Sequence, residues 1–339
     1  MADPIRVLVL TQAPLPDPLI ERLRAVSPRL RVEHRIARTL DELGDAAWRG
    51  VEVLYTTSLM PSPEQAPDLR WVQGHFAGVE NFLAHPLLKK VMLTTSSGIH
   101  TPNMAEYILM MMLAFAHRLP RLIEYQRRAE WPADRWSLFV PRELRGATIG
   151  IVGYGSIGRE VARLVRAFGM RVLATQRDAA HVADTDWRLP DTGDAERAYV
   201  DHLYPAAALH DLLAESDYVA LTLPLTPDTR HLIGAAALRR MKPDAVLINV
   251  SRGGVIDEPA LIEALRAGTI GGAALDVFEE EPLPASSPLW TLPNVILSPH
   301  VSGFTPHYDD RAMALFAENL RRYLAGEELL NVVNLERGY

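Results

Sequence analysis

The chain has 339 residues, which is long enough for two ordinary domains that each bury a hydrophobic core. Its net charge of −7 and its lack of clustered Lys and Arg argue against a nucleic-acid-binding protein, because phosphates are neutralised by concentrated positive charge. There is no cysteine, which excludes disulfides, thiolate catalysis and cysteine-ligated metals, and we expect no other metal site.

The apolar runs of the sequence are too short for a membrane protein. The longest of them, 107–116, is bracketed by polar and charged residues, whereas a helix needs roughly 20 apolar residues to span a bilayer. The run that ends before Thr11 is too short for a signal peptide, and no small-residue cleavage site follows it. We therefore expect a cytoplasmic protein without membrane association.

The first hundred residues alternate short apolar runs with polar stretches that contain proline. Strands that alternate with helical segments usually pair in parallel, so this pattern predicts an α/β domain. The predicted strands are 5–10, 31–35, 51–56, 69–75 and 91–95, and the predicted helix is 18–26.

A long, largely buried helix is predicted next, from Asn103 to about Arg128, with Pro102 at its start. A second alternating series follows and is typical of a doubly wound nucleotide-binding sheet. Its predicted strands are 148–152, 171–175, 218–223, 245–250 and 272–275, and its predicted helices are 157–168, 206–214, 235–241 and 258–267. The acidic segment 178–205 shows little periodicity and predicts a surface excursion, while a last helix over 309–325 could return to the first domain.

A glycine-rich turn lies between the predicted strand 148–152 and the helix after it. Gly153, Gly155 and Gly158, with Ser156 and Ile157 between the last two, form the pattern G-x-G-x-x-G in the strand–turn–helix context that a dinucleotide requires. The glycines permit a tight turn, a close approach of the backbone to a pyrophosphate, and close packing of helix on strand. The helix N-terminus adds N–H donors and partial positive charge for the phosphates.

The residue that selects between NAD and NADP is ambiguous in the sequence. An acid that binds the adenosine ribose is expected about 20 residues after the turn, at the end of the second strand. Gln176 stands there, followed by Arg177 and Asp178. A neutral residue beside an arginine favours the 2′-phosphate of NADP, whereas Asp178 favours NAD, so the expected cofactor is NAD or NADP.

Five segments, in the correct order, resemble the D-isomer-specific 2-hydroxyacid dehydrogenase family, which includes D-lactate, glyoxylate/hydroxypyruvate and 3-phosphoglycerate dehydrogenases. They are 148–158 (TIGIVGYGSIG), 221–229 (LTLPLTPDT), 241–257 (MKPDAVLINVSRGGVID), 273–283 (AALDVFEEEPL) and 293–303 (PNVILSPHVSG). The resemblance implies two doubly wound parallel-sheet domains. One would be a flavodoxin-like substrate domain of residues 1–102 and 301–339, the other a Rossmann dinucleotide-binding domain of residues 103–300.

The resemblance assigns catalysis to Arg252, Glu281 and His300, and the chemistry asks for the same residue types. Reduction of a 2-keto acid needs a proton for the carbonyl oxygen, and histidine has the side-chain pKa nearest neutrality. A carboxylate on the second ring nitrogen fixes the tautomer, and an arginine fork can hold the substrate carboxylate. Among three consecutive acids, the family pattern selects Glu281 because it directly precedes a proline.

Other positions are assigned by resemblance alone. Asp276 would bind the nicotinamide carboxamide, and Pro224, Val250 and Ser251 would line the nicotinamide ribose. The backbone of the loop Ala77, Gly78 and Val79 would receive the substrate carboxylate together with Arg252.

Two alternatives stay open at this point. We expect an NAD(P)-dependent oxidoreductase that transfers a hydride between NAD(P)H and a small 2-keto or D-2-hydroxy acid. The alternative is a dinucleotide-sensing interaction protein, like the transcriptional corepressors that share this fold. The family is usually homodimeric, and the apolar run 104–116 could be a partner surface or internal core.

Overall fold

The computed structural model describes residues 3–177 and 187–338, which form two compact units. Among these residues, the first unit comprises 3–99, 187–189 and 305–338, and the second comprises 100–177 and 190–304. Both are α/β units on a parallel sheet, as predicted.

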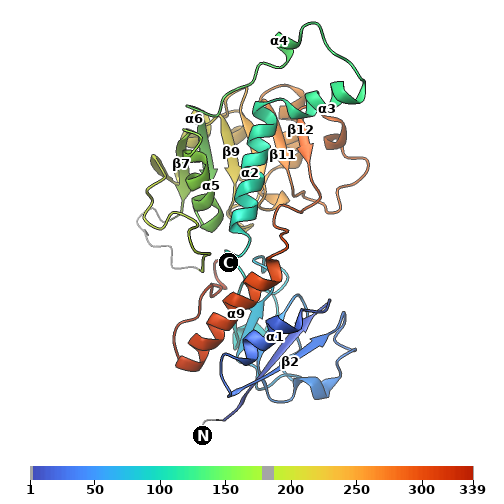
Figure 1. The fold of residues 1–339 in the computed structure, drawn as a ribbon, viewed down its shortest axis with the longest axis vertical. Helices are drawn as coiled ribbons and strands as arrows, with labels where there is room; N and C mark the ends of the chain where they lie inside the picture. The colour runs from blue at the N-terminus through green and yellow to red at the C-terminus, as the bar shows by residue number, and fades with distance from the viewer. Residues whose placement is uncertain (1–2, 178–186, 339) are drawn as a thin grey trace. The chain divides into compact units, whose positions relative to one another are not determined.

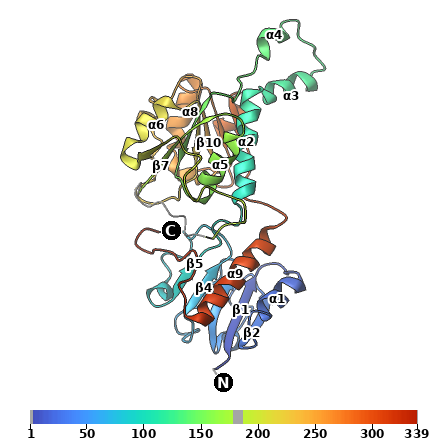
Figure 2. The same ribbon diagram turned by 60° about the vertical axis from the view of Figure 1, so that its left-hand side comes forward.

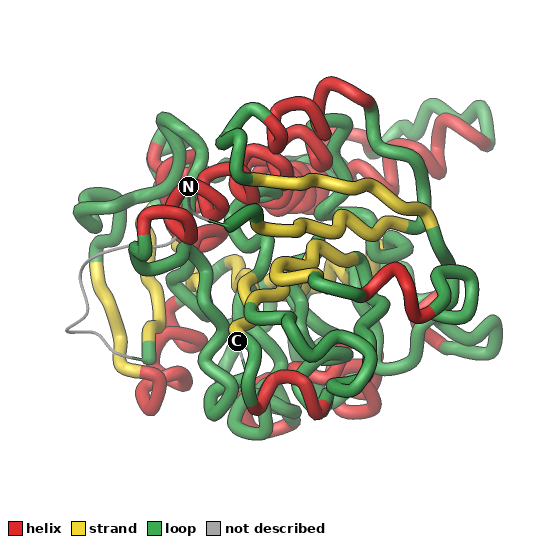
Figure 3. The backbone as a smooth tube through the Cα atoms, turned by 90° about the horizontal axis from the view of Figure 1, so that it is seen from below, coloured by secondary structure: helices red, strands yellow, loops and turns green. Residues whose placement is uncertain are grey.

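The first unit contains a five-stranded parallel sheet in the order β2-β1-β3-β4-β5, which is the order of flavodoxin-like sheets. Its strands are β1 (Ile5–Thr11), β2 (Leu30–Ile36), β3 (Val51–Thr56), β4 (Trp71–Gly74) and β5 (Met92–Thr94). Strands of this sheet run side by side in Figure 3. The five strands predicted here are confirmed, with ends that differ by at most two residues.

Both faces of this sheet are covered because successive strand residues point to opposite sides. Val7 and Val9 of β1 pack with helices α1 (Asp17–Arg24) and α9 (Tyr308–Ala325) on one face. Leu8 of β1 belongs to the core of the other face, which includes side chains of the short helices η1 (Asp45–Trp48) and η2 (Pro86–Lys89). The C-terminal helix α9 therefore completes the core of the first unit, beside α1 (Figure 1).

The second unit contains a seven-stranded sheet in the order β12-β11-β10-β9-β6-β7-β8, and all its neighbours are parallel. Its strands are β6 (Thr148–Val152), β7 (Arg171–Gln176), β8 (His202–Pro205), β9 (Tyr218–Leu221), β10 (Val246–Asn249), β11 (Gly272–Leu275) and β12 (Val295–Leu297). The strand order reverses between β6 and β9, as in a Rossmann fold, and ligands bind at such switch points.

Helices lie on both faces of the second sheet (Figure 2). Tyr218 and Ala220 of β9 pack in the core with α2 (Thr101–Ala116) and α5 (Ser156–Arg166). The alternate residues of β9 pack in the opposite core, with α6 (Leu209–Glu215), α7 (Ala235–Leu238) and α8 (Glu258–Arg266). Each central strand is therefore buried on both sides, which accounts for its nearly unbroken apolar sequence.

The structure corrects two sequence-based predictions. The helix predicted from 103 to 128 is two helices, α2 and α3 (Leu119–Arg127), because Arg118 adopts a left-handed conformation with φ of 53°. Part of the segment predicted as a surface excursion, 178–205, is the edge strand β8. Residues 178–186 of that segment, including Asp178, lie outside the described residues.

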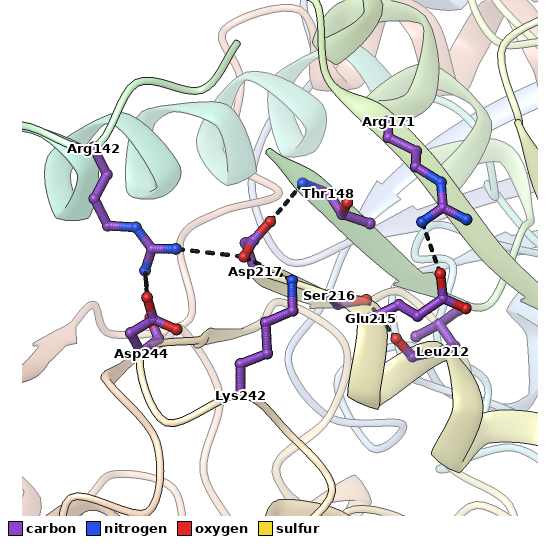
Figure 4. A network of polar contacts seen from close by, with 9 residues as sticks. All are labelled: Arg142, Thr148, Arg171, Leu212, Glu215, Ser216, Asp217, Lys242 and Asp244. Atoms are coloured by element: carbon purple, nitrogen blue, oxygen red, sulfur yellow. Dashed lines mark hydrogen bonds and ion pairs between the residues drawn. The ribbon is translucent and has the colours of Figure 1, made fainter. Parts of the chain in front are cut away.

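The amino ends of three strands in the second sheet are tied together by Asp217, just before β9 (Figure 4). Its carboxylate accepts the backbone N–H of Thr148 at 2.7 Å and pairs with Lys242 at 2.9 Å and with Arg142 at 3.4 Å. Arg142 also pairs with Asp244 at 3.0 Å. One carboxylate thus links the starts of β6 and β9 to the segment that leads into β10.

No helix among residues 3–177 and 187–338 is both long enough and apolar enough to cross a membrane.

Candidate active site

The predicted catalytic and dinucleotide-binding segments of the second unit follow the carboxyl ends of parallel strands. The glycine turn follows β6, Arg252 follows β10, Glu281 follows β11 and His300 follows β12. Because the carboxyl ends of parallel strands meet at one edge, the sheet brings these segments to the same side.

The three glycines of the turn each meet a different steric demand. Gly153 has a φ of 101°, a region that side chains disfavour. A Cβ at Gly158 would lie 2.5 Å from the carbonyl oxygen of Gly153, so only glycine lets α5 pack this closely. A Cβ at Gly155 would meet no described atom within 4 Å, so this residue borders open space.

The N-terminus of α5 suits a pyrophosphate. Gly155 is its N-cap residue, and no described side chain caps the first turn, which begins with Ser156 and Ile157. Thr222, directly after β9, fixes the turn by donating its hydroxyl to the carbonyl oxygen of Gly153 at 2.7 Å. Open space beside Gly155 and uncapped N–H groups are what a bound phosphate requires, so these residues fit a dinucleotide.

Asn249, the last residue of β10, shapes the loop that carries Arg252. Its side chain is fully buried and accepts both the N–H and the hydroxyl of Ser251, at 3.0 and 2.7 Å. It also donates to the carbonyl oxygen of Arg252 at 3.0 Å. The Arg252 guanidinium in turn donates to the carbonyl oxygen of Ser251 at 2.8 Å, so the loop holds its own arginine in place.

Gly253 brings the Arg252 loop against the loop that carries Glu281. A Cβ at Gly253 would lie 1.9 Å from the carbonyl carbon of Phe278 and 2.4 Å from the backbone nitrogen of Glu279. No side chain larger than hydrogen fits between these two backbones. Arg252 and Glu281 are therefore placed by direct contact between the two loops.

Glu281 and His300 form an ion pair at this edge, with 2.7 Å between Glu281 Oε2 and His300 Nδ1. The other carboxylate oxygen of Glu281 accepts the N–H of Phe278 at 3.0 Å, which fixes the carboxylate. The His300 side chain is 50% exposed and that of Glu281 is 36% exposed. With Nδ1 on the carboxylate, Nε2 is the ring nitrogen that can exchange a proton with a substrate.

Asp276 organises the loop that carries His300. It is fully buried, and its carboxylate accepts the hydroxyl of Ser298 at 2.5 Å and the N–H groups of Val301 and Ser302, both at 2.9 Å. Its carbonyl oxygen accepts the N–H of His300 at 2.8 Å. These bonds hold His300 in a left-handed conformation with φ of 54°.

Helix α2 supports the same loop from outside. Tyr107 hydrogen-bonds Ser298, and Asn103 donates to the carbonyl oxygen of Ser302 at 2.5 Å. Burial raises the pKa of the Tyr107 hydroxyl to about 12, so it stays protonated at neutral pH. The apolar run that we predicted as buried helix thus also positions the His300 loop.

The other predicted site residues are placed as follows. Val250 is buried directly after β10, and the carbonyl oxygen of Pro224 accepts the hydroxyl of Thr229 at 2.7 Å. The loop 77–79 belongs to the first unit, where it follows β4, with Val79 buried and its neighbours partly exposed. The roles that resemblance gives to these residues, and to Asp276 toward nicotinamide, stay predictions.

At the end of β7, our sequence analysis missed Arg197. Gln176 ends β7, and its side-chain oxygen accepts a hydrogen bond from Arg197 at 3.1 Å. Asn249 was likewise missed as an organiser of the Arg252 loop. Neither role has a local signal, because each depends on where a loop closes. Among the described residues, no group of three His, Cys, Asp or Glu side chains could hold a metal ion.

Comparisons with known proteins agree with this arrangement. The family model of the D-isomer specific 2-hydroxyacid dehydrogenase, NAD binding domain, matches residues 109–302. The chain is 40% identical to a glyoxylate/hydroxypyruvate reductase B of Pectobacterium carotovorum, over 80% of this chain and 81% of that protein. It is 38% identical to a glyoxylate reductase of Korarchaeum cryptofilum, over 80% of this chain and 78% of that protein.

A solved structure is similar over the whole length. The D-isomer specific 2-hydroxyacid dehydrogenase of Xanthobacter autotrophicus, in complex with NADPH and MES, superimposes with a TM-score of 0.80 at 31% identity. The match covers 100% of both chains.

Proposed function

Because the chain belongs to the D-isomer specific 2-hydroxyacid dehydrogenase family and is an NAD(P)-dependent oxidoreductase, we propose that it reduces small 2-keto acids to D-2-hydroxy acids. The observation that carries this proposal is the His300–Glu281 pair, 2.7 Å apart, on the sheet edge that also carries the glycine turn and Arg252. The names of the similar proteins, glyoxylate and hydroxypyruvate reductases, favour a substrate with a small side chain.

His300 is the proposed acid. A bound nicotinamide supplies the hydride for the carbonyl carbon, and the chain must supply a proton for the carbonyl oxygen. His300, protonated on both nitrogens, donates from Nε2 while Nδ1 stays on Glu281. The carboxylate stabilises the imidazolium before the transfer and keeps the ring oriented after it.

Arg252 is the proposed substrate anchor. Its planar guanidinium can bind a carboxylate through two parallel hydrogen bonds, which a lysine ammonium cannot do with the same geometry. The Asn249 contacts and the close packing of Gly253 support this role, because they fix the arginine relative to the Glu281 loop. The loop 77–79 is proposed to bind the same substrate carboxylate through its backbone N–H groups.

The two units carry separate proposed tasks. We propose that residues 1–102 with 301–339 bind the substrate and that residues 103–300 bind the dinucleotide; these bounds differ from those of the two units by a few residues at each boundary and at 187–189. The glycine turn is proposed to hold the pyrophosphate, with Ser156 and Ile157 in the first turn of α5 beneath it. A cytoplasmic location stays part of this proposal.

The proposed assembly is a homodimer. Helix α3, helix α4 (Arg135–Leu138) and the segment between them project from the second unit in Figures 1 and 2, and they carry large exposed apolar side chains. Trp131 is 84% exposed and Trp136 is 78% exposed, as expected of a surface that a second copy covers.

Light scattering should give twice the chain mass, and a Trp131→Ser, Trp136→Ser double variant should shift the protein toward monomer. A monomeric wild type would remove this part of the proposal.

The activity is tested by following NADPH and NADH consumption with glyoxylate, hydroxypyruvate, pyruvate and phenylpyruvate. We expect turnover of at least the two smallest substrates and a D-2-hydroxy acid product by chiral chromatography. His300→Ala should abolish this turnover without changing NADPH binding. Tight dinucleotide binding with no turnover of any 2-keto acid would overturn the proposal and favour an interaction protein.

A further inference from the structure

The segment that leads into β8 is folded onto the glycine turn by a buried aspartate. Asp194 is 3% exposed, and its carboxylate accepts the hydroxyl of Tyr154 at 2.6 Å. The same carboxylate accepts the N–H groups of Ala198 and Tyr199 at 2.7 and 3.0 Å. Tyr154 is the variable residue between the first two glycines of the turn, so the dinucleotide loop and this segment share one hydrogen-bond network.

Helix α5 fixes the same segment with two further buried side chains. Arg159 is 2% exposed, donates to the carbonyl oxygen of Asp194 at 2.5 Å and lies 5.0 Å from the centre of the Tyr154 ring. Glu160, also 2% exposed, accepts the N–H of Gly193 at 2.7 Å. A buried charge is costly unless it is hydrogen-bonded, and here Arg159 and Glu160 find their hydrogen-bond partners in this segment. A loop attached only loosely to the surface would not satisfy buried charges in this way. The segment is therefore held in one position.

The residue that this anchor positions is Arg197. Its backbone is left-handed, with φ of 55°, which is uncommon for a residue other than glycine and is held here by the Asp194 bonds to the next two residues. The guanidinium of Arg197 donates to the side-chain oxygen of Gln176 at 3.1 Å. The segment held by Asp194 thus places the Arg197 guanidinium at the end of β7.

The described side chain that contacts Gln176 is a guanidinium, whereas a ribose diol is usually bound by a carboxylate. An NAD-specific site places a carboxylate at the end of this strand, and a carboxylate repels a 2′-phosphate. Here the residue is neutral, and Arg197 and Arg177 flank it. Arg177 lies 3.9 Å from Asp228, in an ion pair whose side chains are 46% and 86% exposed and which is therefore weak.

We propose that Arg197 is a coenzyme-selecting residue, which with Arg177 favours the adenosine 2′-phosphate of NADP over the ribose diol of NAD, and that Asp194 and Tyr154 position it. This inference rests on the proposed function, because it names which dinucleotide that site prefers. A phosphate monoester carries close to two negative charges and three acceptor oxygens, and an arginine fork matches them in charge and geometry.

The direct test measures equilibrium binding of NADPH and of NADH, without substrate, by titrating the nicotinamide fluorescence. The wild type should bind NADPH more tightly than NADH. Arg197→Ala should weaken NADPH binding by about tenfold or more, as expected for a lost charge-assisted hydrogen bond, and should change NADH binding by less than about twofold. Arg239→Ala removes an exposed arginine at the end of α7 and should change neither.

The positioning role needs a milder substitution. Tyr154→Phe keeps the ring under Arg159 but removes the hydroxyl that Asp194 accepts. We expect NADPH binding to weaken by about threefold, roughly the effect of one neutral hydrogen bond, with a smaller change for NADH. Arg197→Lys should restore part of the NADPH preference that Arg197→Ala loses, because it restores the charge without the fork.

Several outcomes separate this inference from the proposed function. If Arg197→Ala leaves the ratio of the NADPH and NADH dissociation constants unchanged, Arg197 does not select the coenzyme. Thermal unfolding of each variant shows whether an equal loss comes from a damaged fold, and Arg197→Gln then repeats the test with a side chain of similar size. If the NADPH preference depends on Arg197 but no 2-keto acid is reduced, the proposed function fails and this inference stands.

Discussion

The two edges of the second sheet use charge in opposite ways. At the amino edge, the carboxylate of Asp217 is paired directly with Lys242 and Arg142 and is only 16% exposed (Figure 4). At the carboxyl edge, the buried side chains of Asn249 and Asp276 bond mostly to loop backbone. The residues proposed for chemistry there reach solvent, as the half-exposed His300 shows.

This contrast separates stability from chemistry within one sheet. What differs between the two edges is the partner of each ionisable group. Where two charges satisfy each other, removing one leaves the other without compensation, and stability falls. Where a charged pair reaches solvent, as His300 and Glu281 do, removing one member costs reaction rate and leaves the fold intact.

The largest effect is expected at His300. His300→Asn keeps a side chain that can hydrogen-bond Glu281 but cannot transfer a proton near neutral pH. We expect kcat to fall by about 10²- to 10⁴-fold, the usual contribution of general acid catalysis, and the free energy of unfolding to change by less than about 0.5 kcal/mol. Steady-state kinetics and urea unfolding on the same preparation check both halves. A kcat within about tenfold of wild type would contradict the assignment.

The second prediction concerns the amino edge. Asp217→Ala removes the acceptor of the Thr148 N–H and the partner of Lys242. We expect the free energy of unfolding to fall by about 2–3 kcal/mol, with kcat of the folded enzyme unchanged. Asp244→Ala is the matched control, because Asp244 also pairs with Arg142 but is 65% exposed, so its loss should stay below about 0.5 kcal/mol. A changed kcat in Asp217→Ala would mean that the two edges are coupled.

The third prediction concerns Gly253, where a single substitution should affect stability and catalysis together. Gly253→Ala would force apart the backbones of the Arg252 and Glu281 loops, so both stability and catalysis should suffer. We expect about 1–3 kcal/mol less free energy of unfolding, as for other overpacked sites, and about a tenfold lower kcat/KM. Gly234→Ala is the control, since a Cβ there meets only the carbonyl oxygen of His231 at 3.5 Å. Unchanged kinetics in Gly253→Ala would show that the loops are placed by other contacts.

The sequence predicted those parts of the fold that depend on local pattern. The buried strand β9 is marked by an unbroken apolar run. The glycine turn after β6 is marked by its G-x-G-x-x-G spacing between a predicted strand and a predicted helix. The break at Arg118 had a signal that the prediction overlooked. Pro120 lies just beyond it and has no N–H to donate to the carbonyl oxygen of Ala116, which accepts the N–H of Arg142 instead, so the apolar run alone was a poor guide.

The site was less predictable than the fold because its geometry depends on contacts between distant segments. The resemblance named the residues of the His300–Glu281 pair, but periodicity does not place an acid 19 positions away against a histidine. The contact of Arg197 with Gln176 joins β7 to a segment without periodicity and had no sequence signal at all. The end of β7 is therefore the part of the site where the structure adds most.

The smallest prediction concerns the acidic side chains near the start of α8, at the carboxyl edge. Glu258 begins α8, and burial, followed by the charges of Glu279 and Glu280, raises its pKa above the usual 4.5. A carboxyl whose pKa is raised by folding favours the native state while it is protonated, and this advantage is lost as the pH rises through the folded pKa. Wild-type stability should therefore include a Glu258 contribution that is present below pH 4.5 and absent at neutral pH.

Glu258→Gln isolates this contribution, because an amide oxygen can still accept the Glu279 N–H, which lies 3.3 Å from the carboxylate. At pH 7 the variant should be more stable by a few tenths of a kcal/mol, a value limited by solvent screening of a partly exposed group. The difference should shrink to nothing below about pH 4.5, where the wild-type carboxyl is protonated in both states. Urea unfolding of both proteins across this pH range measures it. A variant that is less stable at pH 7 would show that Glu258 acts there as a charged partner, so that this edge, like the amino edge, would use paired charge for stability.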